Sequence, residues 1–270
     1  MENVLGEAEW NEMVKKIPAQ VKETRMILED KYGLVVPKQC DPFIARCLRL
    51  KDGKIDKAIK LIKTYQATLL DFHNWDAPIQ PSLYGDVFTK TLFSYVQKDS
   101  QGRRLYIFRS EMWDPQNTSF AEIVAAIWIF AQHLNAEYED NQRNGFVTVF
   151  DFSHFTLQQA WALNQWRLIS IMKWVQNGVA GRVKAFHIIF HPRIVSVIYA
   201  GIKPFVKEKL RKRIHFHSSL EALHKHIDPM YLPPFLGGDP NFEYDKSVIK
   251  NILQQDDFYN EMVACGFPSK

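Results

Sequence analysis

Paired cysteines, long apolar runs and an export signal are all missing from this sequence of 270 residues. Its three cysteines, Cys40, Cys47 and Cys265, form no CxxC pair and leave one thiol unpaired under any disulfide scheme, which favours a reducing compartment. The longest apolar run, Ile123–Ala131, is far shorter than the ~20 residues of a membrane-spanning helix. The acidic opening lacks a basic region followed by an apolar stretch, so no secretory signal is expected. These absences predict a cytoplasmic protein that meets membranes only peripherally and transiently.

Motifs of the common enzyme classes are missing as well. The chain contains no GxSxG nucleophile elbow, no GxxxxGKS or GxxxxGKT phosphate loop, no GxGxxG fingerprint and no HExxH zinc motif. Acidic residues such as Glu137 and Asp140 resemble the solvated end of a helix more than the closely spaced carboxylates of a glycosidase. We therefore expect no enzymatic activity. A hydrolase with an exposed nucleophile and base stays open as an alternative.

Two histidines, His215 and His217, stand two apart on a predicted strand and would share one face of a sheet. With His187 or His191 nearby, they offer the nitrogen ligands that zinc accepts. The competing interpretation is a set of surface or hydrogen-bonded histidines in a chain that contains nine. We favour this second interpretation and expect neither a metal ion nor a cofactor.

Aromatic residues and basic charge are what the sequence has in excess. Seven Trp and nineteen Phe supply more rigid apolar surface than packing needs, enough to line a cavity. The net charge of +4 is concentrated in the stretch 203–213, where Glu208 alone opposes the basic residues Lys203, Lys207, Lys209, Arg211, Lys212 and Arg213. On a helix, Lys209 would lie one turn from Arg213, so the stretch predicts a basic face. A solvated helix face is the alternative interpretation.

An anionic membrane suits this basic face, because each Lys or Arg near such a surface contributes about 1 kcal/mol. Nucleic acid is not expected as a partner, since the chain shows no recognition helix and no RNP aromatics. The adjoining segment Ile194–Phe205 is apolar at helical spacing, which fits lipid better than nucleic acid. Gly201 and Pro204 interrupt this segment and mark places where a helix bends, so a mobile lid is expected.

The order of the patterns predicts three segments: a helical bundle over 1–73, an α/β domain over 74–243 and a C-terminal helix over 244–270. Apolar spacing predicts bundle helices over Glu7–Ile17, Ala19–Tyr32, a stretch that starts at Pro42 with Asp41 as its N-cap, and Ile55–Leu70. Beyond a connection at 74–84, strands are predicted over Arg104–Phe108, Gly145–Phe152, Val183–Phe190 and Ile214–His217. They alternate with helices over Phe120–Tyr138 and Leu157–Gln176, and a last helix covers Tyr244–Met262. Such alternation indicates βαβ units around a mostly parallel sheet.

Several stretches together resemble one known family. The segment DPFIARCLRLKDGKIDKAIKLIK is similar to the N-terminal helical signature of CRAL-TRIO proteins, and QRNGFVTVFDFSHF, RVKAFHIIFHPRIVSVIYAGIKPFVKEKLRKRIHFHSS and LPPFLGGD resemble their lipid-binding domain. The match runs in order from about Asp41 to Asp239. The resemblance implies an α/β fold in which a helical bundle precedes a domain whose mostly parallel sheet floors a lipid cavity, gated by a mobile helix at Ile194–Phe205.

The resemblance also implies site residues. Pocket-lining positions of the family fall on Trp128, Ile129, Phe146, Phe150, Ile171, Trp174, Val179, Phe186, Val195, Ile198, Tyr199 and Ile202. The positions that contact the phosphates of a phosphoinositide fall on Lys51, Arg182, Lys184, Lys209 and Arg213. Two departures from the family pattern lie outside the implied cavity, Gly53 and the pair Phe235-Leu236, whereas Trp128 and Gln132 reshape the pocket itself.

The expected function is that of a carrier for one hydrophobic small molecule, tocopherol-, retinoid- or carotenoid-like, which docks on phosphoinositide membranes through its basic cleft. A ligand-free module of the same fold that binds membranes or proteins is the alternative. A lipid-presenting sensor, which keeps its ligand at the membrane, is a further one.

Overall fold

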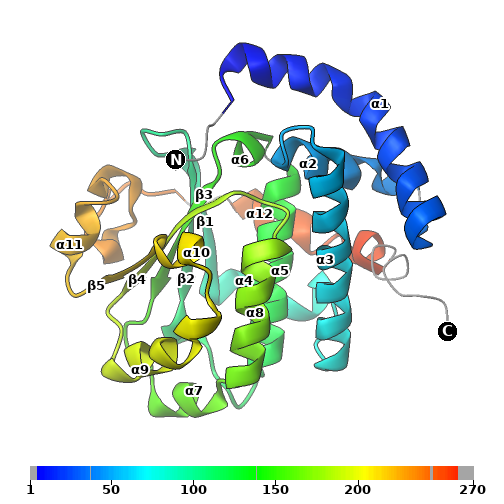
Figure 1. Ribbon diagram of the computed structural model, residues 1–270. Coiled ribbons are helices and arrows are strands. Elements are labelled where there is room, and N and C mark those ends of the chain that lie inside the picture. The colour runs from blue at the N-terminus through cyan, green and yellow to red at the C-terminus, as the bar shows by residue number, and fades with distance from the viewer. Residues whose placement is uncertain (1–4, 37, 138, 244–245, 261–270) are drawn as a thin grey trace.

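The computed structural model describes residues 5–36, 38–137, 139–243 and 246–260, without the side chains of residues 39, 73, 91–97, 112 and 246. A five-stranded sheet, ordered β1-β2-β3-β4-β5, crosses the molecule, and helices pack on both of its faces (Figure 1). Strands β2 to β5 run parallel, and β1 pairs antiparallel with β2. The predicted α/β class, with a helical N-terminal part and a mostly parallel sheet, is confirmed.

The strands are β1 (Leu92–Lys98), β2 (Arg104–Arg109), β3 (Phe146–Asp151), β4 (Val183–Ile189) and β5 (Ile214–His217). The α-helices are α1 (Glu7–Tyr32), α2 (Asp41–Leu50), α3 (Ile55–Asn74), α4 (Gly85–Thr91), α5 (Phe120–Glu137), α6 (Glu139–Arg143), α7 (Leu157–Ala162), α8 (Gln165–Asn177), α9 (Arg193–Ile202), α10 (Glu208–Arg211), α11 (Leu220–His224) and α12 (Lys246–Ile252). Short 3₁₀ turns are η1 (Lys38–Cys40), η2 (Pro81–Tyr84), η3 (Ser110–Met112), η4 (Lys203–Phe205), η5 (Pro229–Tyr231) and η6 (Pro234–Leu236).

The N-terminal helices differ in two details from those predicted. The two helices predicted on either side of Pro18 form one continuous helix, α1, because a proline can bend a helix without ending it. Figure 1 shows α1 curving over the bundle. Asp41 does not cap α2 with its side chain; its carboxylate accepts a hydrogen bond from Arg25 of α1 instead. The acidic group therefore joins two helices of the bundle.

Two predicted helices are divided in the α/β domain. The stretch predicted as one helix over Leu157–Gln176 forms α7 and α8, because the Asn164 side chain accepts from the backbone N–H of Arg167 and begins a new helix. The basic stretch is not one helix either, since η4 and the single-turn α10 are separated at Val206 and Lys207. Helix α4 and strand β1 are absent from the sequence-based prediction; they lie between the expected connection at 74–84 and the first predicted strand at Arg104.

The C-terminal helix is also shorter than predicted. α12 ends at Ile252, and a turn at 253–254 separates it from helical residues 256–260. Tyr244, Asp245 and the residues from 261 onward lie outside the described part of the chain. Within that part, no helix is both long and apolar enough to cross a membrane.

One hydrophobic core joins the N-terminal helices to the α/β domain. Trp128 of α5 is fully buried, and its ring centroid lies 5.1 Å from that of Tyr65 and 5.6 Å from that of Phe72, both on α3. Tyr259, near the C-terminus, closes the same cluster 6.1 Å from Trp128. The predicted segments 1–73 and 74–243 therefore share their core, and the boundary between them stays a prediction.

Replacing the tryptophan at the centre of this cluster tests its contribution. We expect Trp128→Ala to lower the free energy of unfolding by about 3 to 5 kcal/mol, because the cavity left behind cannot close. Urea denaturation followed by far-UV circular dichroism measures the change. The matched control is Trp161→Ala, at a side chain that is 86% exposed, where little change is expected. Equal losses in the two variants would contradict the shared core.

Candidate functional site

An apolar cavity of about 270 Å³ lies between the sheet and the helices α5, α8 and α9. Figure 1 shows α5 and α8 on one side of the sheet and α11 on the other. The volume is close to the lower end of the roughly 300 to 1,000 Å³ that small-molecule sites occupy. The cavity is therefore large enough for one compact apolar molecule or for part of a longer one.

The strands supply the cavity floor through their side-chain alternation. Alternate residues of each strand point into the cavity. They are Tyr106 and Phe108 on β2, Phe146, Thr148 and Phe150 on β3, Phe186 and Ile188 on β4, and Ile214 and Phe216 on β5. The residues between them face a second, smaller core, formed by Leu105, Ile107, Val147, Val149, Ala185, Ile189, Leu223, Ile227, Leu232 and Leu236. Both faces of the sheet are thus buried, as the nearly continuous apolar strands predict.

Most of the predicted ligand-binding residues surround this cavity. Those that line it are Phe146, Phe150, Ile171, Trp174, Val179, Phe186, Val195, Ile198, Tyr199 and Ile202. Trp128 and Ile129 are not among the lining residues. They lie on the other side of α5, where Trp128 meets the bundle and Ile129 accepts a hydrogen bond from the Tyr259 hydroxyl at its carbonyl oxygen. The residues that α5 presents to the cavity are Phe120, Ile123, Val124, Ile127, Phe130 and Ala131.

The chemistry of the lining is uniform. No Asp, Glu, Lys, Arg or His lines the cavity in the described part of the chain. Burial raises the pKa of the Tyr199 hydroxyl, so this group too stays neutral. An ionised ligand group would lose its hydration without gaining a partner there, which costs several kcal/mol or more. The cavity therefore suits a neutral apolar molecule.

Helix α9 with η4, which we call the gate, closes one side of the cavity. Val195 and Ile202 turn inward, whereas Val197 is 60% exposed to solvent. The C-terminal end of the gate is fastened to α8: Gln176 Nε2 donates to the Phe205 carbonyl oxygen at 3.3 Å, and Lys207 Nζ donates to Asn177 Oδ1 at 2.6 Å. In the described residues, the N-terminal end of the gate therefore has fewer hydrogen bonds to α8 than its C-terminal end.

The five predicted phosphate-contacting residues lie along the ends of α2, β4 and α10. Lys51 directly follows α2, Arg182 and Lys184 lie at the start of β4, and Lys209 and Arg213 lie on and after α10. Arg213 Nη1 donates to the Val183 carbonyl oxygen at 2.5 Å, which ties the stretch before β5 to the start of β4. We call this group the basic cleft.

Arg182 is held by the protein itself. Its Nε donates to the Gln142 carbonyl oxygen at 2.6 Å, and its Nη2 donates to the Arg49 carbonyl oxygen at 3.2 Å and pairs with Asp52 Oδ1 at 2.6 Å. Because Asp52 follows Lys51 directly, this contact brings the end of α2 to the start of β4. Arg182 thereby joins the bundle to the sheet as well as contributing charge.

Gly145, just before β3, allows the start of β3 to approach the start of β4 closely. Its φ is +81°, and a Cβ there would stand 2.3 Å from the Arg182 carbonyl oxygen and 2.8 Å from side-chain carbons of Lys184. Only glycine fits such a backbone position without displacing its neighbours. The aliphatic part of Lys184 therefore lies directly over the backbone of Gly145.

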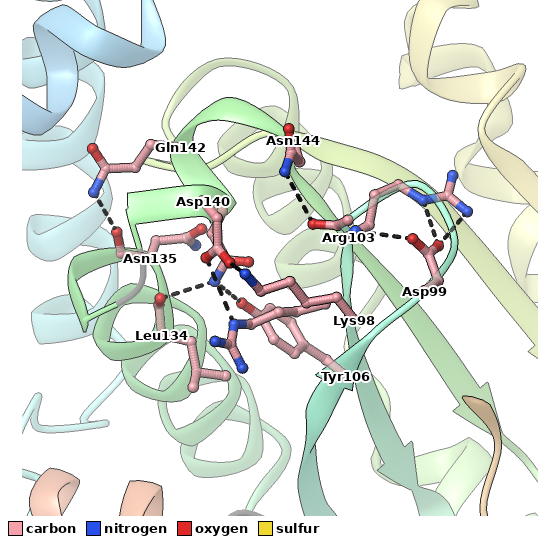
Figure 2. Close-up of polar contacts among 12 residues, drawn as sticks. Lys98, Asp99, Arg103, Tyr106, Leu134, Asn135, Asp140, Gln142 and Asn144 are labelled. Carbon is pink, nitrogen blue, oxygen red and sulfur yellow. Dashed lines mark hydrogen bonds and ion pairs between the residues drawn. The ribbon is translucent and has the colours of Figure 1, made fainter. Parts of the chain in front are cut away.

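A polar network beside Gly145 fixes α6 to the sheet (Figure 2). Asn141 Nδ2 donates to the Tyr106 hydroxyl at 2.6 Å and to the Leu134 carbonyl oxygen at 2.9 Å, and Gln142 Nε2 donates to the Asn135 carbonyl oxygen at 3.0 Å. Asp140, predicted as solvated, instead pairs with Lys98 and lies 3.7 Å from Arg104. Its partners come from β1 and β2, which sequence spacing alone does not bring near α6.

Two of these histidines are hydrogen-bonded to each other. His187 Nδ1 and His217 Nε2 are 2.8 Å apart, so one ring nitrogen donates directly to the other. Among the described residues, no group of three or more His, Cys, Asp or Glu side chains has the arrangement that holds a metal ion. These rings lie on the face of the sheet opposite the cavity.

Comparisons with known proteins agree with this architecture. The family model described as the CRAL/TRIO domain matches residues 88–238. The chain is 28% identical over 245 residues to a protein named "Alpha-tocopherol transfer protein-like" from Homo sapiens, which covers 89% of this chain and 71% of that protein. It is 30% identical over 241 residues to Clavesin-1 from Xenopus laevis, covering 86% of this chain and 71% of that one.

A solved structure gives the same result for the fold alone. The structure described as "Crystal structure of Sfh5" aligns with a TM-score of 0.50 at 13% sequence identity, and it covers 93% of this chain and 96% of that chain. The helical N-terminal part and the sheet with its covering helices are thus features of a fold that is already known.

Filling the cavity from the gate tests where apolar molecules bind. We expect Ile198→Trp to weaken binding of an apolar fluorescent probe by about tenfold or more, because the indole takes up part of the small cavity. Fluorescence titration measures the affinity. Val197→Trp places the same side chain on the exposed face of the same helix turn and should leave binding nearly unchanged. Loss of binding in neither variant would mean that the probe sits elsewhere.

Proposed function

Because this chain belongs to the CRAL/TRIO domain family, we propose that it carries one neutral hydrophobic molecule, tocopherol-, retinoid- or carotenoid-like, and delivers it at membranes that contain phosphoinositides. Membership of the family makes it a lipid-binding protein of the transfer class rather than an enzyme. The observation that carries the finer proposal is the cavity, whose lining in the described residues holds no charged side chain. A relative named for tocopherol transfer supports the same ligand class.

The hydrophobic effect supplies the binding energy in this proposal. Burying roughly 400 Å² of isoprenoid surface at ~25 cal/mol per Å² contributes ~10 kcal/mol before the costs of association and ordering. A ligand longer than the cavity needs the gate to shift outward to accommodate it. Binding of this strength implies slow spontaneous release, so delivery requires a trigger at the membrane.

The cargo is tested by extraction. The protein is purified from a eukaryotic host and extracted with organic solvent, and the released molecules are identified by mass spectrometry against a blank. We expect one neutral lipid at near-stoichiometric yield, because an apolar cavity of this kind is costly to leave filled with water. An empty extract, together with no uptake of added retinoids, tocopherols or phospholipids, would instead favour the ligand-free interaction module.

Docking is proposed to use the basic cleft. Lys51 follows α2, Lys184 lies near the start of β4, and Lys209 and Arg213 lie on and after α10, and phosphate groups pair strongly with such charges. The bonds from Arg182 to Asp52 and from Arg213 to Val183 support the proposal that these segments form one site. Arg182 already pairs with Asp52, so a phosphate that binds there competes with a carboxylate of the protein. The family resemblance supports the same five residues.

Exposed apolar side chains support a lipid surface as the partner. Trp161 on α7 and Trp166 on α8 are 86% and 78% exposed, and Leu157 is also largely exposed. On the gate, Val197 and Phe205 are exposed as well. Tryptophan prefers the interface between lipid and water, where its ring is buried and its N–H stays hydrated. These side chains are proposed to enter the bilayer while the basic cleft engages the headgroup.

Release follows if the headgroup prefers an open gate. A ligand shifts a conformational equilibrium only by its difference in affinity for the two states. Lys207 and Lys209 follow the gate directly, and its last residue, Phe205, is tied to Gln176 of α8. A headgroup that draws Lys209 and Arg213 together is proposed to loosen this tie and open the cavity toward the membrane.

Removing charge from the cleft tests the docking step. We expect Lys209→Ala with Arg213→Ala to slow transfer to phosphoinositide vesicles by about tenfold or more, because each lost charge near the surface removes about 1 kcal/mol. Cavity binding should be spared, and fluorescence transfer assays measure both steps. An equal loss of transfer and of cavity binding would contradict a docking role for the basic cleft.

Two controls make this result specific. Lys15→Ala with Lys16→Ala removes two exposed charges from α1 and should leave transfer unchanged. Trp161→Ser with Trp166→Ser should weaken binding to vesicles with and without phosphoinositide alike, since these side chains contribute apolar insertion rather than headgroup recognition. A charge effect of the same size on both kinds of vesicle would argue against headgroup recognition.

A further inference from the structure

Four imidazole rings gather on the face of the sheet that points away from the cavity. His187 lies on β4, His215 and His217 lie on β5, and His226 follows α11. The ring centroids of every pair are between 4.9 and 6.4 Å apart. We call these four residues the histidine tetrad. The tetrad takes no part in the cavity or the basic cleft.

The tetrad and the cavity share two strands. Along β4, His187 stands between Phe186 and Ile188, which line the cavity; along β5, His215 and His217 flank Phe216, which also lines it. β5 is the last strand of the sheet and pairs there with β4 alone. Any change in spacing between the rings therefore reaches the cavity wall through the backbone of a four-residue edge strand.

The surroundings of His187, His215 and His217 oppose positive charge on these rings. Burial, reinforced by His217 and other rings of the tetrad, lowers the pKa of His187 from 6.5 to about 3. Burial and then His226 lower the pKa of His217 to about 4, and the same two causes lower the pKa of His215. The other groups that act on these rings are Arg103 and His191, and both disfavour the charged form.

The element packed against the tetrad offers it no compensating charge. On α11, Glu221 is exposed to solvent, and His224 bonds through Nε2 to the Leu236 carbonyl oxygen at 2.9 Å. Among the described residues, no carboxylate is a cause of the shifted pKa values of the tetrad. Protons on His187 and His217, which are almost fully buried, would therefore repel each other at a ring separation of 5.1 Å.

We propose that the histidine tetrad is an acid-responsive latch: its protonation parts β5 and α11 from β4 and opens the cavity wall at Ile214 and Phe216. The link to cargo release rests on the proposed carrier function, whereas the opening itself does not. The tetrad would make delivery more efficient in a mildly acidic compartment or at an acidic membrane surface, independently of the headgroup in the basic cleft.

The direction of the pH effect follows from linkage. In the open state His187 and His217 are hydrated and have their ordinary pKa of 6.5, whereas in the closed state the pKa of His217 is about 4 and that of His187 about 3. The open state therefore binds protons more tightly, and acid shifts the population toward it. The closed state keeps its full advantage above about pH 6.5, loses it progressively as the pH falls, and has lost it below about pH 3 to 4.

Hydrogen–deuterium exchange of the unliganded protein tests the latch directly. We expect the amides of β5, after correction for intrinsic exchange rates, to open at least about tenfold more at pH 5 than at pH 7, since one pKa unit corresponds to a factor of ten. Amides of β2 and β3 should change far less. No selective acid response of β5 would overturn the proposal.

Two variants and a control make the result specific to the tetrad. His187→Gln with His217→Gln removes two titrating rings and leaves an amide pair able to bond, and it should reduce the acid response to less than about threefold. His215→Gln with His226→Gln, at less buried positions, gives a second variant should the first not fold, and it too should reduce the response. His154→Asn, at an exposed histidine with φ of +58°, should keep the full response. An unchanged response in a folded tetrad variant would overturn the latch.

Release is measured separately with all-trans-retinol as a fluorescent probe. We expect the wild type to lose bound retinol at least about tenfold faster at pH 5 than at pH 7, and the His187→Gln/His217→Gln variant to lose it at nearly one rate. If β5 opens in acid but the wild type and the His187→Gln/His217→Gln variant lose retinol at the same rate at pH 5, the coupling of the tetrad to the cavity is overturned. Failure of the wild type to bind retinol or any other lipid at pH 7 would count against the carrier function, and the exchange of β5 would still decide the latch.

Discussion

Alternation of side chains along β3, β4 and β5 is the constraint on which both halves of the α/β domain depend. Parallel pairing with a fixed register sends Phe186 and Phe216 to one face and His187 and His217 to the other. A slip of one residue would exchange the two sets and place imidazoles in the cavity. One strand register therefore places both the apolar floor of the cavity and the histidine tetrad, on opposite faces of the sheet.

Buried arginines fasten the helical bundle to this sheet. Arg46 of α2 is almost fully buried, and its Nη1 donates to the Gln132 carbonyl oxygen at 2.9 Å. Arg49 Nε donates to Gln142 Oε1 at 2.6 Å, and burial lowers its pKa although Glu139 acts in the opposite direction. A buried cation of this kind is tolerated only where hydrogen bonds replace its water. The backbone carbonyl oxygen of the same residue, Gln142, accepts from Arg182, so the bundle, α6 and the start of β4 meet at one residue.

The sequence was sufficient for the fold class and for most of the cavity, because strand alternation and family motifs both point to the same face of the sheet. It was insufficient for Trp128 and Ile129, since α5 is apolar on all sides and has no polar face to orient it. Asn164 was read as helix interior because an N-cap side chain is recognised only from the bond it makes to Arg167. Arg182 shows the same limit, since Gln142 and Asp52 become its partners only once distant segments have folded together.

Gly145 places one backbone position against both the cavity floor and the start of β4. The backbone there lies beneath the side chain of Lys184 and beside the carbonyl group of Arg182, and the next residue, Phe146, already faces the cavity. A substitution that added even one carbon at position 145 would displace the backbone and side chain at the start of β4, and with them Phe146, the first aromatic residue of the cavity floor on β3. Side chains on either side of this point can change one at a time, whereas the backbone position at Gly145 admits no side chain of its own.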